Sequence, residues 1–353
     1  MLLKILHVIA STGVGGAEKH LLDLCLQQRE LGLEVSVALP AEGALSQALE
    51  THGIKYSLIR SGGRLHPLAL WSLRQVIRRM QPDLVHAHML KSAFMVAYAD
   101  RQILCVATAH NIVKHLGPFR RCQHVICVSE MVRESLCQLG YPEAMATVVH
   151  NAVDTHAFNT SKREALRSQY GWQNQLVVLC VARLVPAKGQ TYAIAALVKL
   201  IPKLPNINLV LVGEGDDRDK LLQQAHQSGV SEHLSLLGSR NDVPDLLAAA
   251  DIYLQPSIKE GFCIAFLEAM ATGLACIGTQ TGAIPTMLDT GNNGILIPPG
   301  DTDAIDEAIV SVAEDAELRT RFAVAARITA QTQFSPQKQA RDTVAVYQQA
   351  LNQ

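Results

Sequence analysis

Short, continuously apolar runs alternate with longer amphipathic segments along the whole of this 353-residue chain. Uninterrupted runs of Val, Ile, Leu and Ala are typical of strands that are covered on both faces of a parallel sheet. The longer segments between them have the pattern of amphipathic helices. This β-α alternation predicts an α/β chain with open, doubly wound sheets.

The alternation runs through the chain twice. Strands are predicted at 3–10, 34–39, 55–60, 83–88, 103–109, 124–129 and 146–151, and then at 176–182, 207–212, 234–237, 252–256, 275–279 and 294–297. Helices are predicted at 16–31, 44–52, 67–80, 91–99 and 130–139, and then at 188–201, 216–228, 243–250, 263–272, 302–314, 316–332 and 336–351. The polar stretch 154–175 has the composition of a linker.

These patterns predict two Rossmann-like domains that face a central cleft. The first domain is placed at 1–160, the second at 170–334, and a terminal helix at 335–353. Whether this helix crosses back to the first domain is left open. A chain of this length divides comfortably into two domains of ordinary size, and 48% apolar residues suffice for two cores.

Charge and cysteine content narrow the class of protein. The net charge of −1 gives no indication of nucleic-acid binding. Residues 1–170 hold 18 Lys and Arg against 13 Asp and Glu, so the first half is basic. None of the eight cysteines forms a C-x-x-C pair, and several lie in apolar runs, which is typical of reduced thiols in a cytoplasmic protein. The apolar start of the chain is too short for a membrane span and is interpreted as the first strand.

Ligands of doubly wound sheets bind beyond the carboxyl ends of the strands, so the residues there carry the functional argument. A glycine-rich stretch, 13–16, follows the first strand, and its backbone could approach an anionic ligand at a helix start. Glu18 stands where the dinucleotide fingerprint G-x-G-x-x-G requires its last glycine, which argues against a dehydrogenase. A tight turn without a ligand is the alternative.

Two cations follow the first strand of the second half. Arg183 comes at the strand end and Lys188 at the next helix start, so they could flank a diphosphate. An Arg/Lys pair in a loop is also commonly just solvated.

The segment 256–270 carries the strongest local pattern. Glu260 lies in the loop after a strand, and Glu268 follows about two turns further along the next helix. An acid on an otherwise apolar helix needs a partner, and ligand hydroxyls are suitable partners. Pairing of Glu268 with a nearby basic residue is the alternative.

Together these elements resemble the family 4 glycosyltransferases, which have the GT-B fold and retain the anomeric configuration, over nearly the whole chain. The residues that carry the resemblance are Gly15-Gly16-Ala17-Glu18, Val128-Ser129-Glu130, Asn151-Ala152-Val153-Asp154, Ala182-Arg183-Leu184 with Lys188-Gly189, Val212-Gly213-Glu214-Gly215, and Glu260 with Glu268. The departures from the family pattern are Ala152, Ala182, Cys263 and Thr286. Because these departures lie on the donor side, they leave the identity of the donor more open than the fold.

The resemblance implies a role for each matched residue. Arg183 and Lys188 would bind the donor diphosphate and Glu268 the donor ribose. Glu260, with the backbone of Gly261 and Phe262, would hold hydroxyls of the transferred sugar. The other positions assigned to the donor are Gly15, Gly16, Gly213, Ser239, Arg240 and Cys263, with the backbone near Ser239 and Arg240 facing the base. His110, after a first-half strand, would lie near the sugar as a catalytic residue beside Arg183, Lys188 and Glu260.

No metal or other cofactor is expected. The pairs Asp217/Asp219 and Asp301/Asp303 match D-x-D, but Asp is favoured at helix starts, so capping is the favoured interpretation. Arg183, Lys188 and helix dipoles could neutralise the leaving nucleotide in place of a metal. His86 and His88 lack a third ligand at a zinc spacing and are predicted to line the cleft or the core.

The first domain also carries a candidate membrane surface. Helix 67–80 has apolar residues at Leu68, Leu70, Trp71 and Leu73, and the arginines clustered around it are Arg60, Arg64, Arg74, Arg78 and Arg79. In the same domain, Lys114, Arg120 and Arg121 flank Leu116, Pro118 and Phe119. Such a surface could rest on anionic lipid at the inner face of the plasma membrane. An ordinary amphipathic helix is the alternative.

The sequence therefore predicts a retaining glycosyltransferase that closes on a UDP- or GDP-type sugar. The acceptor hydroxyl would belong to a glycan or a lipid-linked saccharide, as in lipopolysaccharide synthesis. A nucleotide-sugar epimerase of the same fold and a non-catalytic nucleotide-sugar-binding protein are the competing hypotheses.

Overall fold

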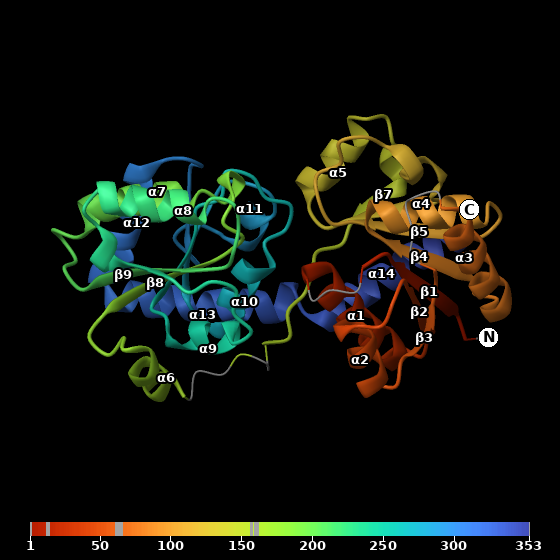
Figure 1. Cartoon of the computed structure of the whole chain (residues 1–353), viewed down its shortest axis with the longest axis horizontal. Coiled ribbons are helices and arrows are strands. Elements are labelled where there is room, and N and C mark those ends of the chain that lie inside the picture. The colour runs from red at the N-terminus through yellow and green to blue at the C-terminus, as the bar shows by residue number, and fades with distance from the viewer. Residues whose placement is uncertain (1, 12–14, 61–65, 156–157, 159–161, 353) are drawn as a thin grey trace. The chain divides into compact units, whose positions relative to one another are not determined.

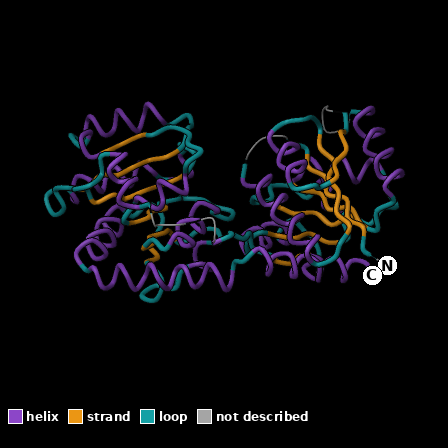
Figure 2. The backbone as a smooth tube through the Cα atoms, turned by 90° about the horizontal axis from the view of Figure 1, so that it is seen from below, coloured by secondary structure: helices purple, strands orange, loops and turns teal. Residues whose placement is uncertain are grey.

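The computed structural model describes residues 2–11, 15–60, 66–155, 158 and 162–352 (Figure 1). The chain forms two compact units. Unit 1 comprises Met1–Ala152 and Pro336–Gln353, and unit 2 comprises Val153–Ser335. In each unit the strands lie between layers of helices, as Figure 2 shows. The expected α/β architecture with two Rossmann-like units is confirmed.

Unit 1 contains a seven-stranded parallel sheet in the order β3-β2-β1-β4-β5-β6-β7. Its strands are β1 (Lys4–Ile9), β2 (Glu34–Leu39), β3 (Lys55–Leu58), β4 (Leu84–His88), β5 (Cys105–Ala109), β6 (His124–Cys127) and β7 (Ala146–Val148). The helices are α1 (Gly16–Glu30), α2 (Ala44–Thr51), α3 (Pro67–Met80), α4 (Met89–Ala99), α5 (Glu130–Cys137) and α14 (Pro336–Leu351), with short 3-10 helices η1 (Gly117–Arg121) and η2 (Glu143–Met145).

The centre of this sheet carries histidines among its apolar residues. His7 of β1 stands opposite His86 of β4 in the parallel register, and Ile9 stands opposite His88. On the other side of β4, His88 is opposite Thr108 of β5. All three histidines are buried. The strands therefore place several imidazole rings next to one another inside unit 1.

The last helix of the chain, α14, belongs to unit 1 and lies beside α1 (Figure 1). Its Val346, Tyr347 and Ala350 are at most 2% exposed and pack with strand residues of the first sheet. The Tyr347 hydroxyl accepts a hydrogen bond from Nε2 of Gln28 at 3.0 Å. The terminal helix thus does cross back to the first domain.

Unit 2 contains a six-stranded parallel sheet in the order β10-β9-β8-β11-β12-β13. Its strands are β8 (Leu176–Val181), β9 (Ile207–Val212), β10 (Leu234–Leu236), β11 (Ile252–Gln255), β12 (Ala275–Thr279) and β13 (Ile295–Ile297). The helices are α6 (Arg163–Tyr170), α7 (Gln190–Leu200), α8 (Arg218–Gln227), α9 (Val243–Ala249), α10 (Ile264–Thr272), α11 (Ile284–Met287), α12 (Thr302–Glu314) and α13 (Ala316–Gln333), with η4 (Pro186–Lys188) and η5 (Ser231–His233).

The stretch 154–175 is not a simple linker, because it contains helix α6. Two arginines of this helix bind the segment between α9 and β11: Arg167 Nη1 lies 3.0 Å from Asp251 Oδ2, and Arg163 also pairs with Asp251. Arg167 further donates to the carbonyl oxygens of Trp172 and Gln175, both at 2.6 Å. The prediction was wrong here because the helix is short and polar, and long-range arginine contacts hold it in place.

Candidate functional site

The loops at the carboxyl ends of β8, β9 and β11 form the centre of the candidate site in unit 2. In the sheet, β8 lies between β9 and β11, so the chain leaves β8 at the point where the strand order reverses. Ligands of open α/β sheets bind at such switch points. Arg183 and Lys188 follow β8, and Glu260 follows β11, so the sheet places all three beside its switch point.

Two glycines let these loops pack backbone against backbone. Gly213, after β9, has φ of +139°, and a Cβ there would lie 2.1 Å from the carbonyl oxygen of Ala182. Gly189, at the start of α7, has φ of +68°, and a Cβ there would lie 2.0 Å from the Pro256 carbonyl oxygen. The second approach is reinforced because the Ala187 carbonyl accepts from the N–H groups of Ile258 and Lys259. These contacts fix the β8 loop against the loops that follow β9 and β11.

The best-defined contact in this region joins Lys188 to Glu260. Lys188 Nζ lies 2.6 Å from Glu260 Oε1, and the two side chains are only 18% and 4% exposed. Their charges are therefore largely shielded from water. In such surroundings an ion pair is stronger than at the surface. The two residues were assigned to different parts of the donor, and the structure brings their side chains into direct contact.

A row of buried polar side chains, linked by hydrogen bonds, leads to Glu260 and was not predicted from the sequence. Ser257 Oγ donates to Glu260 Oε1 at 2.8 Å, and Gln255 Nε2 donates to Ser257 Oγ at 2.8 Å. The Tyr253 hydroxyl in turn donates to Gln255 Oε1 at 2.9 Å. A glutamine in a buried strand, two residues before a buried serine, was the available signal. This hydrogen-bonded row orients the Glu260 carboxylate.

Arg183 differs from Lys188 in its surroundings. Its side chain is exposed, and within the described part of the chain no carboxylate lies within ion-pair distance of its guanidinium. Its carbonyl oxygen accepts from Gln190 Nε2 at 2.9 Å, which ties the backbone at this point to α7. The fold therefore holds the backbone of Arg183 in place while its charge faces solvent.

The other predicted residues of this segment lie just before α10 and on it. Gly261 is half-buried, whereas Phe262 and Cys263 are 9% and 6% exposed. Burial raises the pKa of the Cys263 thiol well above its usual value, so this thiol is neutral. Glu268 lies on α10 at a half-buried position. Glu268 is less buried than its neighbours because Phe266, Leu267, Ala269 and Met270 form the buried face of the helix.

Ser239 and Arg240 follow β10, at the same end of the sheet. The Arg240 guanidinium is paired with Asp242, whose carboxylate also accepts from the Tyr170 hydroxyl at 3.0 Å. Hydrogen bonding from Arg240 lowers the pKa of Asp242. The pairing with Asp242 restricts the rotation of the Arg240 side chain. The backbone of Arg240 remains the part assigned to the base.

The acidic pairs that resemble D-x-D lie at helix starts. Asp301 caps α12, because its Oδ1 accepts from the N–H groups of Asp303 and Ala304, both at 3.0 Å. Asp217 directly precedes α8. Capping therefore accounts for Asp301, as the sequence suggested, whereas Asp217 makes no side-chain capping hydrogen bond.

The glycine-rich stretch of unit 1 begins α1. Gly13 lies outside the described residues, whereas Gly15 immediately precedes the helix and Gly16 is its first residue. The Gly15 N–H donates to Glu18 Oε2 at 3.0 Å. Glu18 is 8% exposed, so the acid of this motif is buried at the helix start and fixes the approach of the loop.

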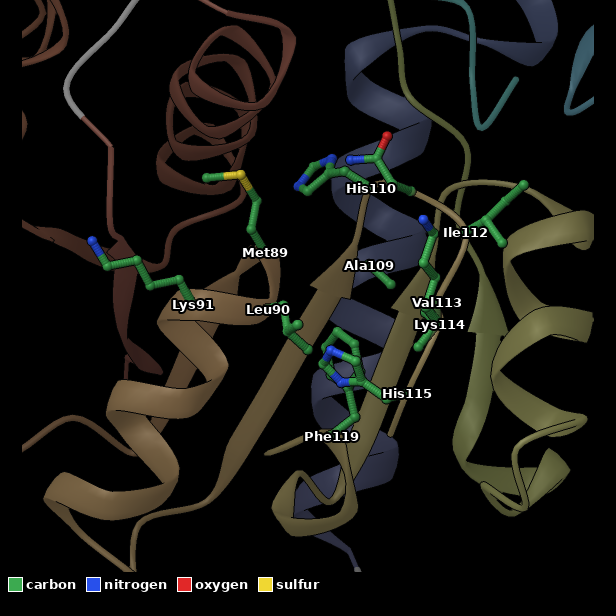
Figure 3. A pocket seen from close by; sticks show the side chains of 11 residues that line it. Met89, Leu90, Lys91, Ala109, His110, Ile112, Val113, Lys114, His115 and Phe119 are labelled. Atoms are coloured by element: carbon green, nitrogen blue, oxygen red, sulfur yellow. The ribbon is translucent and has the colours of Figure 1, made fainter. Parts of the chain in front are cut away.

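His110 lines a pocket of about 320 Å³ at the carboxyl ends of β4 and β5. Figure 3 shows Met89 and Leu90, at the start of α4, on one side and the segment that follows β5 on the other. The remaining lining is mainly apolar and includes Ile112, Val113 and Phe119, with Lys91, Lys114 and His115 as polar members. Burial lowers the pKa of His110 to about 4, opposed by the charge of Glu18, so this imidazole is neutral at neutral pH.

His110 is one of five histidines whose rings are neighbours. The ring centroids of His20 and His110 are 4.9 Å apart, and those of His86 and His88 are 4.3 Å apart. His7 completes the group, 5.2 Å from His88. The sequence suggested only His86 and His88 as a possible metal pair, because the others come from elements distant in the sequence.

In the described part of the chain, no helix is both long and apolar enough to cross a membrane.

The sequence and the fold both match known proteins. Residues 162–329 match the family described as glycosyl transferases group 1, and residues 14–157 match glycosyltransferase family 4. A lipopolysaccharide core biosynthesis glycosyltransferase, LpsE, of Rhizobium meliloti is 27% identical over 329 residues, which cover 91% of this chain and 92% of LpsE. The phosphatidyl-myo-inositol mannosyltransferase of Mycolicibacterium smegmatis is 28% identical, over 87% of this chain and 83% of that protein. A crystal structure of Anabaena HepE in complex with UDP-glucose has a TM-score of 0.86 and 27% identity, over 98% of this chain and all of that one.

Proposed function

This chain belongs to the family 4 glycosyltransferases of the GT-B fold, and from that premise we propose that it transfers a sugar from a UDP- or GDP-type donor with retention of anomeric configuration. The observation that carries the proposal is the group formed by Arg183, Lys188 and Glu260 at the switch point of the unit 2 sheet. The donor complex of HepE, a relative of similar fold, supports a nucleotide sugar as the substrate class.

The donor diphosphate would meet the two cations that follow β8. Arg183 is exposed and offers a planar fork of donors that matches phosphate oxygens. The Lys188 ammonium already lies against Glu260, so a bound diphosphate would share it with that carboxylate. Glu260 would accept hydrogen bonds from hydroxyl groups of the transferred sugar. Protein cations would then neutralise the charge that develops on the leaving nucleotide, with no need for a divalent ion.

Transfer is therefore expected to persist in the presence of a chelator. Assays with UDP- and GDP-sugars and a panel of glycan and lipid-linked acceptors, each with and without EDTA, should give equal rates, and the anomeric configuration of the product should be that of the donor. Activity that disappears with EDTA and returns with Mg²⁺ or Mn²⁺ would contradict the role given to the cations. Conversion of the donor to an epimer without acceptor would instead indicate an epimerase.

We place the acceptor in unit 1, at the pocket beside His110. Its mainly apolar lining is suited to the less polar part of an acceptor, and Lys91 and Lys114 supply cations for an anionic group. LpsE acts in lipopolysaccharide core biosynthesis, and the mannosyltransferase of M. smegmatis is named for a phosphatidylinositol lipid. A lipid-linked or lipopolysaccharide acceptor is consistent with both relatives and with the pocket.

The candidate membrane surface is smaller than the sequence suggested. Leu116, Pro118 and Phe119 are buried and so cannot contact lipid, and Leu73 is buried in α3; Arg64 lies outside the described residues. Leu68 and Trp71 of α3 are 48% and 58% exposed, on a face that also carries Arg74, Arg78 and Arg79. An exposed tryptophan among arginines is suited to the headgroup region of an anionic bilayer, and we propose that α3 makes this contact.

Replacing Trp71 by serine should weaken binding to vesicles. In pelleting assays with phosphatidylglycerol vesicles, the wild type should pellet at low salt, less so at high salt, and W71S should remain mostly in the supernatant. The matched control is Val324→Ser, because Val324 is 55% exposed on α13 of unit 2, and it should pellet like the wild type. Equal pelleting of W71S and the wild type would contradict a membrane role of α3.

A further inference from the structure

The five-histidine group divides into two sets of three rings, and only one of these sets is satisfied by the protein itself. In each set, every ring offers a nitrogen within 4.8 Å of the others: His7, His86 and His88 in the first, and His20, His88 and His110 in the second. The two sets share His88. Their hydrogen bonds decide which of them could hold a ligand.

The first set is part of a continuous buried hydrogen-bond chain. His7 Nε2 lies 2.8 Å from Gln28 Oε1, and Gln28 Nε2 donates to the Tyr347 hydroxyl. His86 uses both nitrogens, with the Tyr347 hydroxyl at 2.6 Å from Nδ1 and Thr108 Oγ1 at 2.6 Å from Nε2. These contacts account for His7 and His86 as structural core residues.

The same chain fixes the tautomer of His88. Because Gln28 Oε1 can only accept, His7 carries its proton on Nε2, and its Nδ1 accepts. His88 Nε2, at 2.9 Å, must then be the donor to His7 Nδ1. The Nδ1 atom of His88 is left as a lone-pair acceptor. In the described part of the chain no hydrogen-bond partner reaches this buried atom.

The second set gathers three such atoms. His20 Nε2, His88 Nδ1 and His110 Nε2 are all buried and have no hydrogen-bond partner among the described residues. Their residues come from three elements: α1, the end of β4 and the loop after β5. Buried polar atoms almost always have a partner, so three neighbouring exceptions point to a shared ligand. Asn151 Oδ1 is a fourth such atom. The Asn151 side chain lies close enough to His20 to oppose the lowering of the His20 pKa, but the two make no hydrogen bond of ordinary geometry.

The protonation state of these rings and one nearby carboxylate suit a metal ligand set. Burial lowers the pKa of His20 and of His88 well below the usual value, so the rings are neutral, which is the form that ligates metals. Glu18 is buried close enough to His110 to raise its pKa against the effect of burial, and this carboxylate would offset part of a dication's charge. Three neutral imidazoles with one open position are a known coordination set for zinc.

We propose that His20, His88 and His110 form a three-histidine site for Zn²⁺ in unit 1, distinct from the metal-free donor chemistry proposed for unit 2. Binding requires one rearrangement. His20 Nδ1 now faces the Gln339 amide nitrogen at 3.2 Å, and a His20 that ligates through Nε2 carries its proton on Nδ1. The Gln339 side chain must therefore turn its oxygen toward His20, giving up its bond to the His150 carbonyl.

The experiment measures Zn²⁺ binding to the full chain after dialysis against a chelator. Titration calorimetry should show one ion per chain, and Co²⁺ as a probe should give the visible absorption of a four-coordinate site. H88A and H110A should each lower the affinity by at least about tenfold. H110A serves as the second variant because His110 is only half-buried and its loss is tolerated more readily than that of the fully buried His88. H226A removes an exposed histidine of α8 and should bind like the wild type.

Three results would overturn the site: no stoichiometric binding to the wild type, equal affinities of wild type and H110A, or a loss in H226A as large as in H110A. None of these readouts uses transfer activity, so the failure of the metal site and the failure of the proposed function can be told apart. Because His110 lines the pocket proposed for the acceptor, Zn²⁺ should also inhibit transfer by occupying its ring nitrogen. Chelator should reverse that inhibition.

Discussion

Replacing Arg183 by alanine is expected to lower the rate of sugar transfer by roughly a hundredfold or more, with little change in folding. Removal of one donor that stabilises transition-state charge typically has an effect of about this size. The side chain is exposed, and within the described residues it has no acidic partner, so its loss leaves no buried charge behind. The measurement is kcat at saturating donor and acceptor, together with the melting temperature.

The matched control is Arg321→Ala, which removes an exposed arginine from α13 in the same unit. It should keep the wild-type rate. Lys188→Ala is a less informative variant, because it would leave the buried Glu260 carboxylate without its 2.6 Å partner and would lower both activity and stability. A wild-type kcat in R183A would remove Arg183 from the reaction.

Replacing Asp251 by alanine is expected to destabilise unit 2 by roughly 3 kcal/mol. Asp251 Oδ2 accepts from Arg167 at 3.0 Å and from the Val177 N–H at 2.8 Å, and its other oxygen pairs with Arg163. The Arg167 side chain is only 8% exposed, so the variant leaves a largely buried guanidinium without its counter-ion, which commonly costs about 3–5 kcal/mol. We choose the lower end because Arg163 is 30% exposed and can be solvated.

Urea unfolding followed by tryptophan fluorescence tests this effect. The chain has two tryptophans: Trp172 lies buried in unit 2, next to Arg167, and Trp71 lies exposed in unit 1. In a Trp71→Phe background the signal therefore reports on unit 2 alone. Asp303→Ala is the control, because its ion pair with Lys199 is well exposed and should contribute little. Equal midpoints for D251A and D303A would contradict the anchoring role.

The sequence was most informative where a feature depends on neighbours along the chain. Every predicted strand is present within a few residues, because each is an uninterrupted apolar run between helical segments. The ends of α3 and α12 were predicted without error, helped by Pro67 at the start of α3 and Asp301 before α12. The positions of Arg183, Lys188 and Glu260 after strands followed from the same alternation. Their assignment to particular parts of the donor remains a prediction.

The features that were missed depend on residues far apart in the sequence. Helix α6 is held by Asp251, more than 80 residues away, and nothing in its own polar sequence marks it as a packed element. The hydrogen-bonded polar row that leads to Glu260 starts on the buried strand β11, where periodicity predicts apolar residues. The histidine group joins His20 of α1, His88 at the end of β4 and His110 in the loop after β5, so only the parallel register of the sheet reveals it.

The return of α14 to unit 1 has a consequence for biosynthesis. A nascent chain emerges from the ribosome from its amino terminus, and domains usually fold in that order. Here Tyr347 and its neighbours pack against strand residues of the first sheet, so this core cannot close until α14 has been synthesised. The 183 residues from Val153 to Ser335 can meanwhile complete their own fold. Unit 1, whose first strands are made first, is therefore expected to complete its fold after unit 2, and it stays accessible to chaperones and proteases for longer.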